Sequence, residues 1–383
     1  MTAPRSIVIA GAGIGGLTAA LALAARGFRV TVLEKADRLE EAGAGLQLSP
    51  NASRILIALG LQPHLLLHVT CPDAVNIMTA RNGGALIRLP LTARDNAPYW
   101  ALRRADLQSA LLAAVRDNPA IAIRLGDAVT GFAVTPGGVT VNDEDAWALI
   151  GADGVWSAVR GRLYPDVRPQ FSGLVAWRGT REATQPAQDM PPRQVQLWMG
   201  PRAHLVAYPM ASGRRINMVA IVPGMEAGGS GDDIRGAFAS SGWPAPARGM
   251  VDAVTDWRRW PLYTLPDGGV WHDGPVALLG DAAHAMLPFA AQGAGMAIED
   301  AAVLARCLGE ASNHGDVAAA LARYADLRRP RVMRVQRTAR QSGKIYHLRG
   351  PMALARDLVM QMLGAARLQA RQNWIYDWRD AGL

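Results

Sequence analysis

Residues 7–34 read IVIAGAGIGGLTAALALAARGFRVTVLE, and this stretch decides the fold class. A short apolar run ends at Gly11, which is typical of a buried parallel strand. Small and apolar residues from 15 to 26 predict a helix, Gly27 ends it, and a β-rich run from 28 to 33 follows. A strand, a helix and a second strand make one βαβ unit, so we expect a parallel sheet covered by helices.

The glycines between the first strand and the helix have the spacing of a dinucleotide-binding turn. Gly11 permits the tight turn, Gly13 lets the backbone approach a pyrophosphate, and Gly16 lets the helix pack on the strand. The start of the helix, at Ile14 and Gly15, then faces the phosphate charge. We predict that these five residues bind a dinucleotide.

The second strand ends in Glu34, which is followed by Lys35. A carboxylate at the end of this strand accepts hydrogen bonds from a ribose 2′-hydroxyl and repels a 2′-phosphate. The site therefore favours FAD or NAD over NADP, and the turn alone does not choose between FAD and NAD. We predict that both residues contribute to cofactor binding.

The composition limits the class of protein. The chain has 383 residues, half of them hydrophobic, which is enough for two packed domains. The net charge of +8 comes almost wholly from arginine, since lysine occurs only at positions 35 and 344. The arginines are scattered, so we predict anionic small ligands and no nucleic-acid partner.

The two cysteines, Cys71 and Cys307, stand in unlike contexts and form no C-x-x-C motif. They predict neither a metal site nor a disulfide framework, and they fit a reducing compartment. The first strand begins almost at the N-terminus, and the apolar stretch at 17–25 is too short to span a bilayer. We expect a cytoplasmic protein without a membrane partner, either a monomer or a homodimer.

Two further glycine–aspartate stretches follow the first turn. Residues 151–154 read GADG and residues 280–284 read GDAAH, each after an apolar run. In this order, the three stretches resemble the fingerprint of the FAD-dependent aromatic-ring monooxygenases, the family of p-hydroxybenzoate and salicylate hydroxylases. The resemblance covers most of the chain and implies FAD as the bound cofactor.

The resemblance implies roles for residues of the third stretch. Asp281 corresponds to the aspartate that holds the ribityl chain of FAD, and its carboxylate can accept hydrogen bonds from hydroxyl groups. Pro288 and the glycine-rich segment of Gly293, Ala294 and Gly295 correspond to the backbone beside the flavin ring. Read alone, the same stretch is equally a strand, a turn and a helix that Asp281 caps.

Three other residues receive cofactor roles from the resemblance. Asp153 belongs to a segment implicated in FAD and nicotinamide binding, although a local turn also explains it. Arg104 aligns with an arginine that contacts the pyrophosphate, and its alternative is a solvent-exposed helical arginine. Residues 43–51, GAGLQLSPN, resemble the loop beneath the flavin, where Gln47 touches the cofactor or is an ordinary polar loop residue.

The candidate catalytic residues are His204, Tyr208 and Gln292. His204 and Tyr208 are four residues apart on a predicted strand, so they share one face. Together with Gln292 they resemble the branch of 3-hydroxybenzoate 6-hydroxylase and salicylate hydroxylase. Core packing is the alternative role for each of them. Residues 177–179, WRG, also resemble a family segment but receive no chemical role.

The resemblance implies a flavin-dependent monooxygenase. Such an enzyme hydroxylates a small, anionic aromatic substrate with O2 and NADH or NADPH as transient cosubstrates, through a flavin C4a-hydroperoxide. Two alternatives stay open: a reductase or halogenase-like flavoprotein on the same scaffold, and a flavin-binding sensor without turnover. The exact substrate, the position hydroxylated and the choice of NADH or NADPH are not readable from the sequence, nor is whether His204 or Tyr208 acts as a base.

The order of predicted elements implies discontinuous domains. We predict an α/β protein in which a Rossmann-like FAD-binding domain is interleaved with a mainly β substrate domain, followed by C-terminal helices interrupted at Pro330 and Pro351. The predicted boundaries are 1–70, 100–170 and 265–330 for the FAD-binding domain, 71–99 and 171–264 for the substrate domain, and 331–383 for the C-terminal helical segment.

Overall fold

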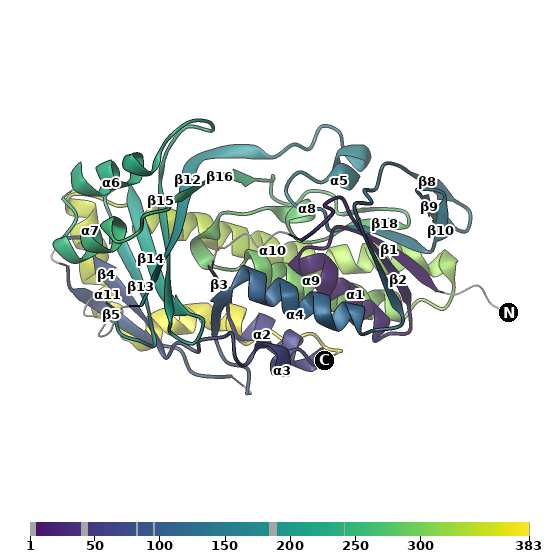
Figure 1. The fold of residues 1–383 in the computed structure, drawn as a ribbon, viewed down its shortest axis with the longest axis horizontal. Coiled ribbons are helices and arrows are strands. Elements are labelled where there is room, and N and C mark those ends of the chain that lie inside the picture. Colours follow the sequence, from purple (N-terminus) through teal and green to yellow (C-terminus); the bar gives the residue numbers. More distant parts are fainter. Residues whose placement is uncertain are drawn as a thin grey trace.

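The computed structural model describes residues 5–39, 45–81, 83–94, 96–183, 190–240 and 242–382. Two sheets stand at opposite ends of the molecule, and long helices run between them (Figure 1). This mixed α/β architecture with C-terminal helices confirms the predicted fold class. Of the predicted flavin loop, Gly43 and Ala44 lie outside the described residues, whereas Gln47 lies within them.

A six-stranded sheet contains the strands predicted around the glycine stretches. Its strands are β1 (Ser6–Ala10), β2 (Arg29–Glu34), β7 (Ile121–Leu125), β11 (Ala148–Gly151), β17 (His272–Asp273) and β18 (Val276–Leu278). The order is β17-β18-β11-β1-β2-β7, and every neighbouring pair is parallel except β17 with β18. The three glycine stretches follow β1, β11 and β18, so parallel neighbours bring them to one edge of the sheet.

Three helices pack around this sheet: α1 (Ile14–Ala24), α4 (Arg104–Arg116) and α9 (Gly293–Gly309). Helix α1 contacts both α4 and α9, and its small residues allow this close packing. At Gly15 an added Cβ would lie 2.6 Å from the side chain of Leu279 and 3.2 Å from that of Ala297. The glycine-rich start of α1 therefore lies close against Leu279, which follows β18, and against α9.

A seven-stranded sheet forms the other end of the molecule. Its strands are β4 (Ala74–Thr79), β5 (Ala85–Pro90), β12 (Gln170–Glu182), β13 (Gln194–Gly200), β14 (Ala203–Met210), β15 (Arg215–Pro223) and β16 (Arg258–Thr264). The order is β16-β12-β15-β14-β13-β4-β5. Helices α6 (Gly231–Ser240) and α7 (Ala245–Asp252) contribute Phe238 and Met250 to a core with this sheet. The strands come from the two predicted β segments, and the domain boundaries stay a prediction.

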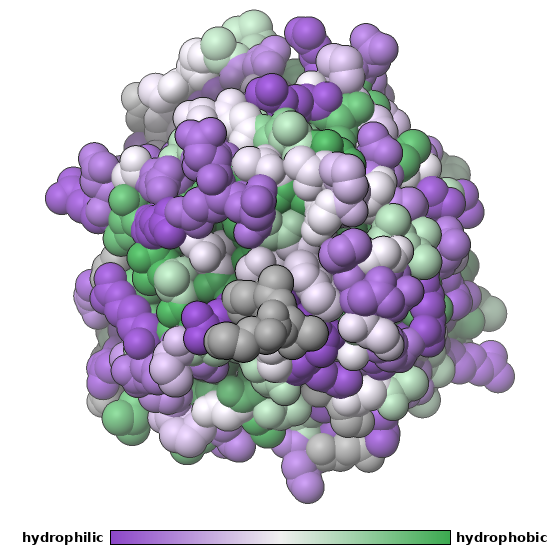
Figure 2. Space-filling view, turned by 90° about the vertical axis from the view of Figure 1, so that its right-hand side faces the viewer, coloured by the Kyte–Doolittle hydropathy of each residue, from purple (hydrophilic) through white to green (hydrophobic). Residues whose placement is uncertain are grey.

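Shorter elements complete the described chain. They are β3 (Gly45–Leu48), which pairs with β6 (Trp100–Arg103); β8 (Phe132–Thr135), β9 (Gly138–Val141) and β10 (Glu144–Ala146), which form a small sheet; α2 (Pro50–Ala58), α3 (Gln62–Leu65), α5 (Ala158–Leu163) and α8 (Asp281–His284); and the 3₁₀ turns η1 (Pro288–Ala290) and η2 (His314–Asp316). On the face that carries the six-stranded sheet, hydrophilic and hydrophobic residues are interspersed (Figure 2).

Two long C-terminal helices, α10 (Val317–Tyr346) and α11 (Pro351–Tyr376), link the two sheets. The predicted interruption at Pro330 is wrong, because Pro330 lies inside α10. Ion pairs on both sides of the proline hold the helix, since Arg328 and Arg331 both bind the buried carboxylate of Glu299. The predicted break at Pro351 is confirmed, and the predicted domain boundary at residue 331 falls within α10.

Candidate functional site

In the first glycine turn, Gly11 and Gly16 are crowded by backbone, whereas Gly13 is open. Gly11 has φ +103°, and a Cβ there would lie 2.6 Å from the carbonyl oxygen of Ala152. A Cβ on Gly16 would collide with the carbonyl oxygen of Gly11. At Gly13, in contrast, an added Cβ would meet no described atom within 4 Å. Gly11 and Gly16 are thus required by the fold, whereas Gly13 borders open space.

The second strand is tied back to this turn by Glu34. Its Oε2 accepts a hydrogen bond of 2.8 Å from the backbone N–H of Ala12, and its Oε1 accepts one of 3.0 Å from Ala36. The carboxylate therefore fixes the glycine turn from beneath. The predicted ribose contact of Glu34 stays a prediction. Neither Glu34 nor the exposed Lys35 lines the principal cavity.

The second glycine stretch divides its residues between the cavity and a local cap. Ala152 and Gly154 line the cavity, but Asp153 does not. The Oδ2 of Asp153 accepts hydrogen bonds of 2.7 and 3.2 Å from the N–H groups of Ala158 and Val159, so it caps α5. Its Oδ1 is buried without a partner among the described residues. This favours the local-turn role over direct contact with a ligand.

A cavity of about 700 Å³ lies between the glycine stretches and the seven-stranded sheet. This volume is within the range of small-molecule sites. Of the residues predicted for the cofactor, nine line it: Gly13, Ile14, Gly15, Gln47, Arg104, Asp281, Pro288, Gly293 and Ala294. The predicted residues that do not line it are Gly11, Gly16, Glu34, Lys35, Asp153, Gln292 and Gly295.

Two helix N-termini open onto this cavity. Gly13 is the N-cap of α1 and Gln292 is the N-cap of α9, and the side chain of neither N-cap residue bonds to the first amides of its helix. Free amides at a helix start attract phosphate and other anions. Arg104 adds a guanidinium to the same cavity. The open space at Gly13, the uncapped amides and Arg104 together fit the pyrophosphate of a dinucleotide such as FAD.

The opposite wall is built by strand β14. His204, Val206 and Tyr208 alternate along the strand and all line the cavity, which confirms that His204 and Tyr208 share a face. Both of these side chains are buried. Burial and the neighbouring His347 hold the pKa of His204 well below its ordinary value, so its imidazole is neutral. Burial raises the pKa of Tyr208, so its phenol keeps its proton.

A second histidine stands behind His204. The Nδ1 of His204 and the Nε2 of His347 lie 2.8 Å apart in a hydrogen bond. The rings of Phe289 and Tyr346 pack against His204. The sequence reasoning missed His347 because it follows a long helix 143 residues further along the chain, where no motif marks it.

Arg178 lines the same wall from β12. Its Nε is buried without a partner, and its guanidinium makes no hydrogen bond or ion pair with the described residues. Burial lowers the pKa of Arg178, Tyr208 opposes this change, and Arg104 adds to it. A guanidinium that lines the cavity without a partner among the described residues is chemically suited to pair with an anion.

Gln292 does not occupy the position that the sequence led us to expect. Its Nε2 donates to the hydroxyl of Ser49 over 2.8 Å, and its Oε1 accepts from the side chain of Asn51 over 3.2 Å. A Cβ on Gly295 would lie 3.0 Å from the same Oε1, so Gly295 leaves room for this side chain. The amide is thus turned away from the cavity, and it ties α2 to the start of α9.

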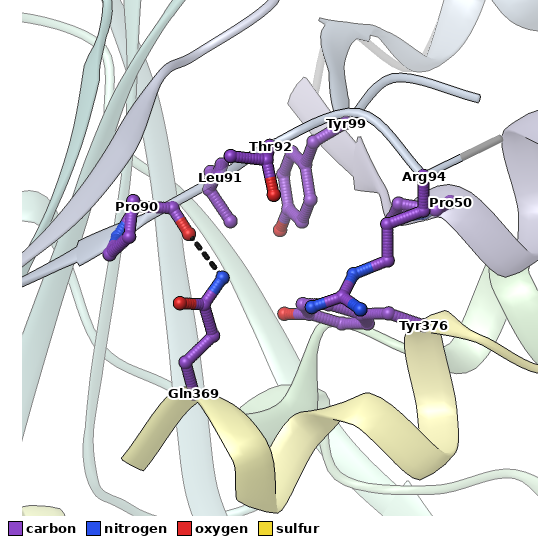
Figure 3. A pocket seen from close by; sticks show the side chains of 8 residues that line it. All are labelled: Pro50, Pro90, Leu91, Thr92, Arg94, Tyr99, Gln369 and Tyr376. Atoms are coloured by element: carbon purple, nitrogen blue, oxygen red, sulfur yellow. Dashed lines mark hydrogen bonds between the residues drawn. The ribbon is translucent and has the colours of Figure 1, made fainter. Parts of the chain in front are cut away.

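A much smaller hollow lies on the outer side of the cavity wall (Figure 3). Tyr99 and Tyr376 border both spaces, and Gln369 of α11 donates a hydrogen bond of 2.7 Å to the carbonyl of Pro90. Its volume of about 10 Å³ has room for about one water molecule. This hollow is therefore a small gap in the packing of α11 against β5, and it is too small for a substrate.

The described residues contain no group of three histidine, cysteine or acidic side chains placed to hold a metal ion. None of their helices combines the length and apolar composition needed to cross a membrane. Both cysteines are free thiols.

The chain is similar to known proteins along nearly its whole length. A family model described as "FAD binding domain" matches residues 5–339. The 3-amino-4-hydroxybenzoate 2-monooxygenase PtmB3 of Streptomyces platensis is 37% identical, over 99% of this chain and 97% of that protein. The 3-hydroxybenzoate 6-hydroxylase of Klebsiella oxytoca is 33% identical, over 97% and 96%. A solved salicylate hydroxylase substrate complex superimposes with a TM-score of 0.82 at 26% identity, covering 99% of this chain and 97% of that one.

Proposed function

This chain belongs to the family of FAD-dependent aromatic-ring monooxygenases, and on that premise we propose that it hydroxylates a small aromatic acid bearing a phenol. FAD, once reduced by NADH or NADPH, supplies the activation of O2 that this reaction requires. Hydroxybenzoates are the substrates in the names of two relatives, and we carry that substrate class to this chain.

One observation carries the proposal: a single cavity has the dinucleotide-binding turns on one side and a potential ring-binding wall on the other. The first side holds Gly13, Asp281 and the start of α9. The second side holds His204 and Tyr208, and aliphatic side chains of the sheet line the space between the two. A ring bound on the second side would lie next to the cofactor in surroundings that exclude water.

The charge of the cavity favours an anionic substrate. Its described lining contains four arginines, Arg104, Arg178, Arg334 and Arg371, and one carboxylate, Asp281. Arg104 is the residue that we assign to the cofactor pyrophosphate. The Nε of Arg178 is buried, no described residue forms an ion pair with its guanidinium, and Arg178 lies close enough to Tyr208 to influence the pKa of that phenol. We therefore assign the substrate carboxylate to Arg178.

His204 and Tyr208 can then act on the phenol of the substrate. The neutral imidazole of His204 has a nitrogen, Nε2, that makes no hydrogen bond with the described residues. This nitrogen can accept the phenolic proton, which makes the ring carbons more nucleophilic. Tyr208 keeps its proton and can donate a hydrogen bond to the same oxygen. Gln292 positions Gly293 and Ala294 in this scheme and does not touch the substrate.

The same chemistry suggests the compartment and the transient partners of the enzyme. A reductant pool of NADH or NADPH and two free thiols fit the cytoplasm. O2 and the nicotinamide cofactor are the transient partners. We propose a monomer or a homodimer.

We expect a hydroxylated aromatic acid to accelerate NAD(P)H oxidation by the FAD-loaded protein. The test is a panel of hydroxybenzoates, aminohydroxybenzoates and pyridine carboxylates, with O2 consumption and product identity measured together. Stimulation with a hydroxylated product supports the proposal. A panel that yields neither stimulation nor product in protein with full FAD content would refute it.

We expect Arg178→Gln to raise the KM for the aromatic acid by about 10- to 100-fold, because one charge-assisted hydrogen-bonding partner is lost. The KM for a matched phenol without a carboxylate should hardly change. Arg258→Gln is the control, since Arg258 pairs with Arg178 across β16 and β12 but is largely exposed. Loss of FAD from Arg178→Gln with an unchanged KM for the acid would assign Arg178 to the cofactor and contradict the prediction.

A further inference from the structure

The histidine pair forms a continuous link from the cavity to the edge of the protein. His204 lines the cavity and is 2% exposed, whereas His347 is only partly buried. Their nitrogens Nδ1 and Nε2 are joined over 2.8 Å. The Nε2 of His204 thus meets the cavity, and the Nδ1 of His347 is at the other end of the pair.

The loop that carries His347 is held firmly in place. The backbone N–H of His347 donates to Gly343 over 3.2 Å, and its carbonyl accepts from Arg202 over 3.2 Å. Arg356 donates to the carbonyls of Ile345 and Tyr346 over 3.1 and 3.3 Å.

Arg356 is itself fixed through the buried Asp357. The two side chains form an ion pair of 2.8 Å, and Asp357 accepts a hydrogen bond of 3.0 Å from Thr79 on β4. The contact between the two histidines is therefore built into the packing of α10 and α11 on the sheet.

Both imidazoles are held in their neutral form. Burial lowers the pKa of His347 to about 4, and burial together with His347 lowers the pKa of His204 well below its ordinary value. A neutral imidazole has one nitrogen that donates and one that accepts. Two neutral rings in contact are therefore able to take up a proton at one end and release another at the far end.

We propose that His347 is a positioning residue through which His204 passes the phenolic proton of the substrate to solvent. This inference rests on the hydroxylase function proposed above. The O–H bond of the phenol breaks and a new N–H bond forms at Nε2 of His204. The proton on Nδ1 of His204 then moves to Nε2 of His347, and the proton on Nδ1 of His347 moves to water. The phenolate keeps the electron pair, and no oxidant or reductant takes part.

The relay gives the phenolic proton a route out of the cavity. A phenol bound against the buried His204 would lie in the cavity wall, where the histidine pair offers its proton a route to the partly exposed His347. A neutral His204 without a second acceptor would become a buried cation, which its surroundings disfavour. His347 removes that positive charge to a partly exposed position.

The test compares His347→Ala and His347→Gln with wild-type protein, all loaded with oxidised FAD. The probe is 3-hydroxybenzoate or salicylate, whichever stimulates NADH oxidation in the panel. Stopped flow with a pH indicator measures proton release on binding, and the ultraviolet spectrum of the bound ring distinguishes phenol from phenolate. Wild-type protein should release the proton and bind the phenolate. Both variants should do so at least about tenfold more slowly.

Imidazole distinguishes a proton relay from simple packing. Added imidazole should restore the rate of His347→Ala, in which space is vacated, but not that of His347→Gln, in which an amide fills it. His314→Ala, at an exposed histidine of η2, is the control and should behave as wild type. Melting temperatures measured in parallel report the packing role of each side chain.

The outcomes separate the two proposals. Wild-type proton-release rates in both His347 variants would overturn the relay and leave the hydroxylase function intact. A lowered melting temperature in His347→Ala with slow release that imidazole does not restore would also overturn it, in favour of packing alone. If wild-type protein hydroxylates no phenol of the panel, the function and the relay both fail.

Discussion

Gly13→Val is expected to give a folded protein that purifies without FAD. Gly13 has φ −73°, which any residue adopts, and an added Cβ would meet no described atom within 4 Å. The valine side chain would instead fill the open space at the start of α1, where we place the pyrophosphate. The measurements are the absorbance of flavin in the purified protein and reconstitution with added FAD, beside circular dichroism and the melting temperature.

The neighbouring glycines supply the contrast for this experiment. Gly11→Val and Gly16→Val should lower the stability of the fold itself, because their side chains would collide with the backbone of Ala152 and of Gly11. Gly249→Val, at an exposed helical glycine with open space around it, controls for the valine. A yellow Gly13→Val protein with wild-type FAD affinity would show that the cofactor does not approach this turn.

His204→Ala and Tyr208→Phe are expected to slow product formation by about 100-fold or more while FAD stays bound. Each change removes a hydrogen-bonding group from the cavity wall opposite the cofactor turns. NADH oxidation should still respond to the substrate, so H2O2 should accumulate in place of hydroxylated product. The deciding measurement is product formed per NADH consumed.

The packing alternative makes a different prediction for these two variants. His204 also contacts Phe289 and Tyr346, so its removal would lower the melting temperature even if it had no chemical role. Tyr208→Phe keeps the ring and loses only the hydroxyl, which makes it the cleaner test. His64→Ala, outside the cavity lining, is the control for a lost histidine. If stable His204 and Tyr208 variants keep the wild-type turnover and the wild-type ratio of product to NADH, these residues have no catalytic role.

Reasoning from sequence placed the three glycine stretches after strands that are neighbours in one sheet, and the roles of individual site residues stay predictions. The turn at Gly11 to Gly16 and the approach of the stretches around Ala152 and Asp281 depend on strands that the apolar runs mark clearly. The family resemblance then named FAD, which the matched domain model confirms. The resemblance did not distinguish Gly11 and Gly16, where an added side chain would collide with backbone, from Gly13, which borders open space.

The sequence alone did not give the direction of the Gln292 side chain, and it misjudged the end of one helix. Gln292 precedes the glycines beside the cavity, so it looked like a substrate contact. The N-cap position of α9 instead turns its amide toward Ser49 and Asn51. Pro330 looked like a helix end, but the ion pairs of Arg328 and Arg331 with Glu299 hold α10 together around it.

Local patterns determined the βαβ unit, the β-rich second sheet and the shared face of His204 and Tyr208. These features depend on the repeat of a strand or a helix, which nearby residues fix. The contact of His204 with His347 depends on how the end of α10 meets β14, and the lack of a partner for Arg178 among the described residues depends on what surrounds β12. Such contacts join residues more than a hundred positions apart, so only the tertiary structure decides them.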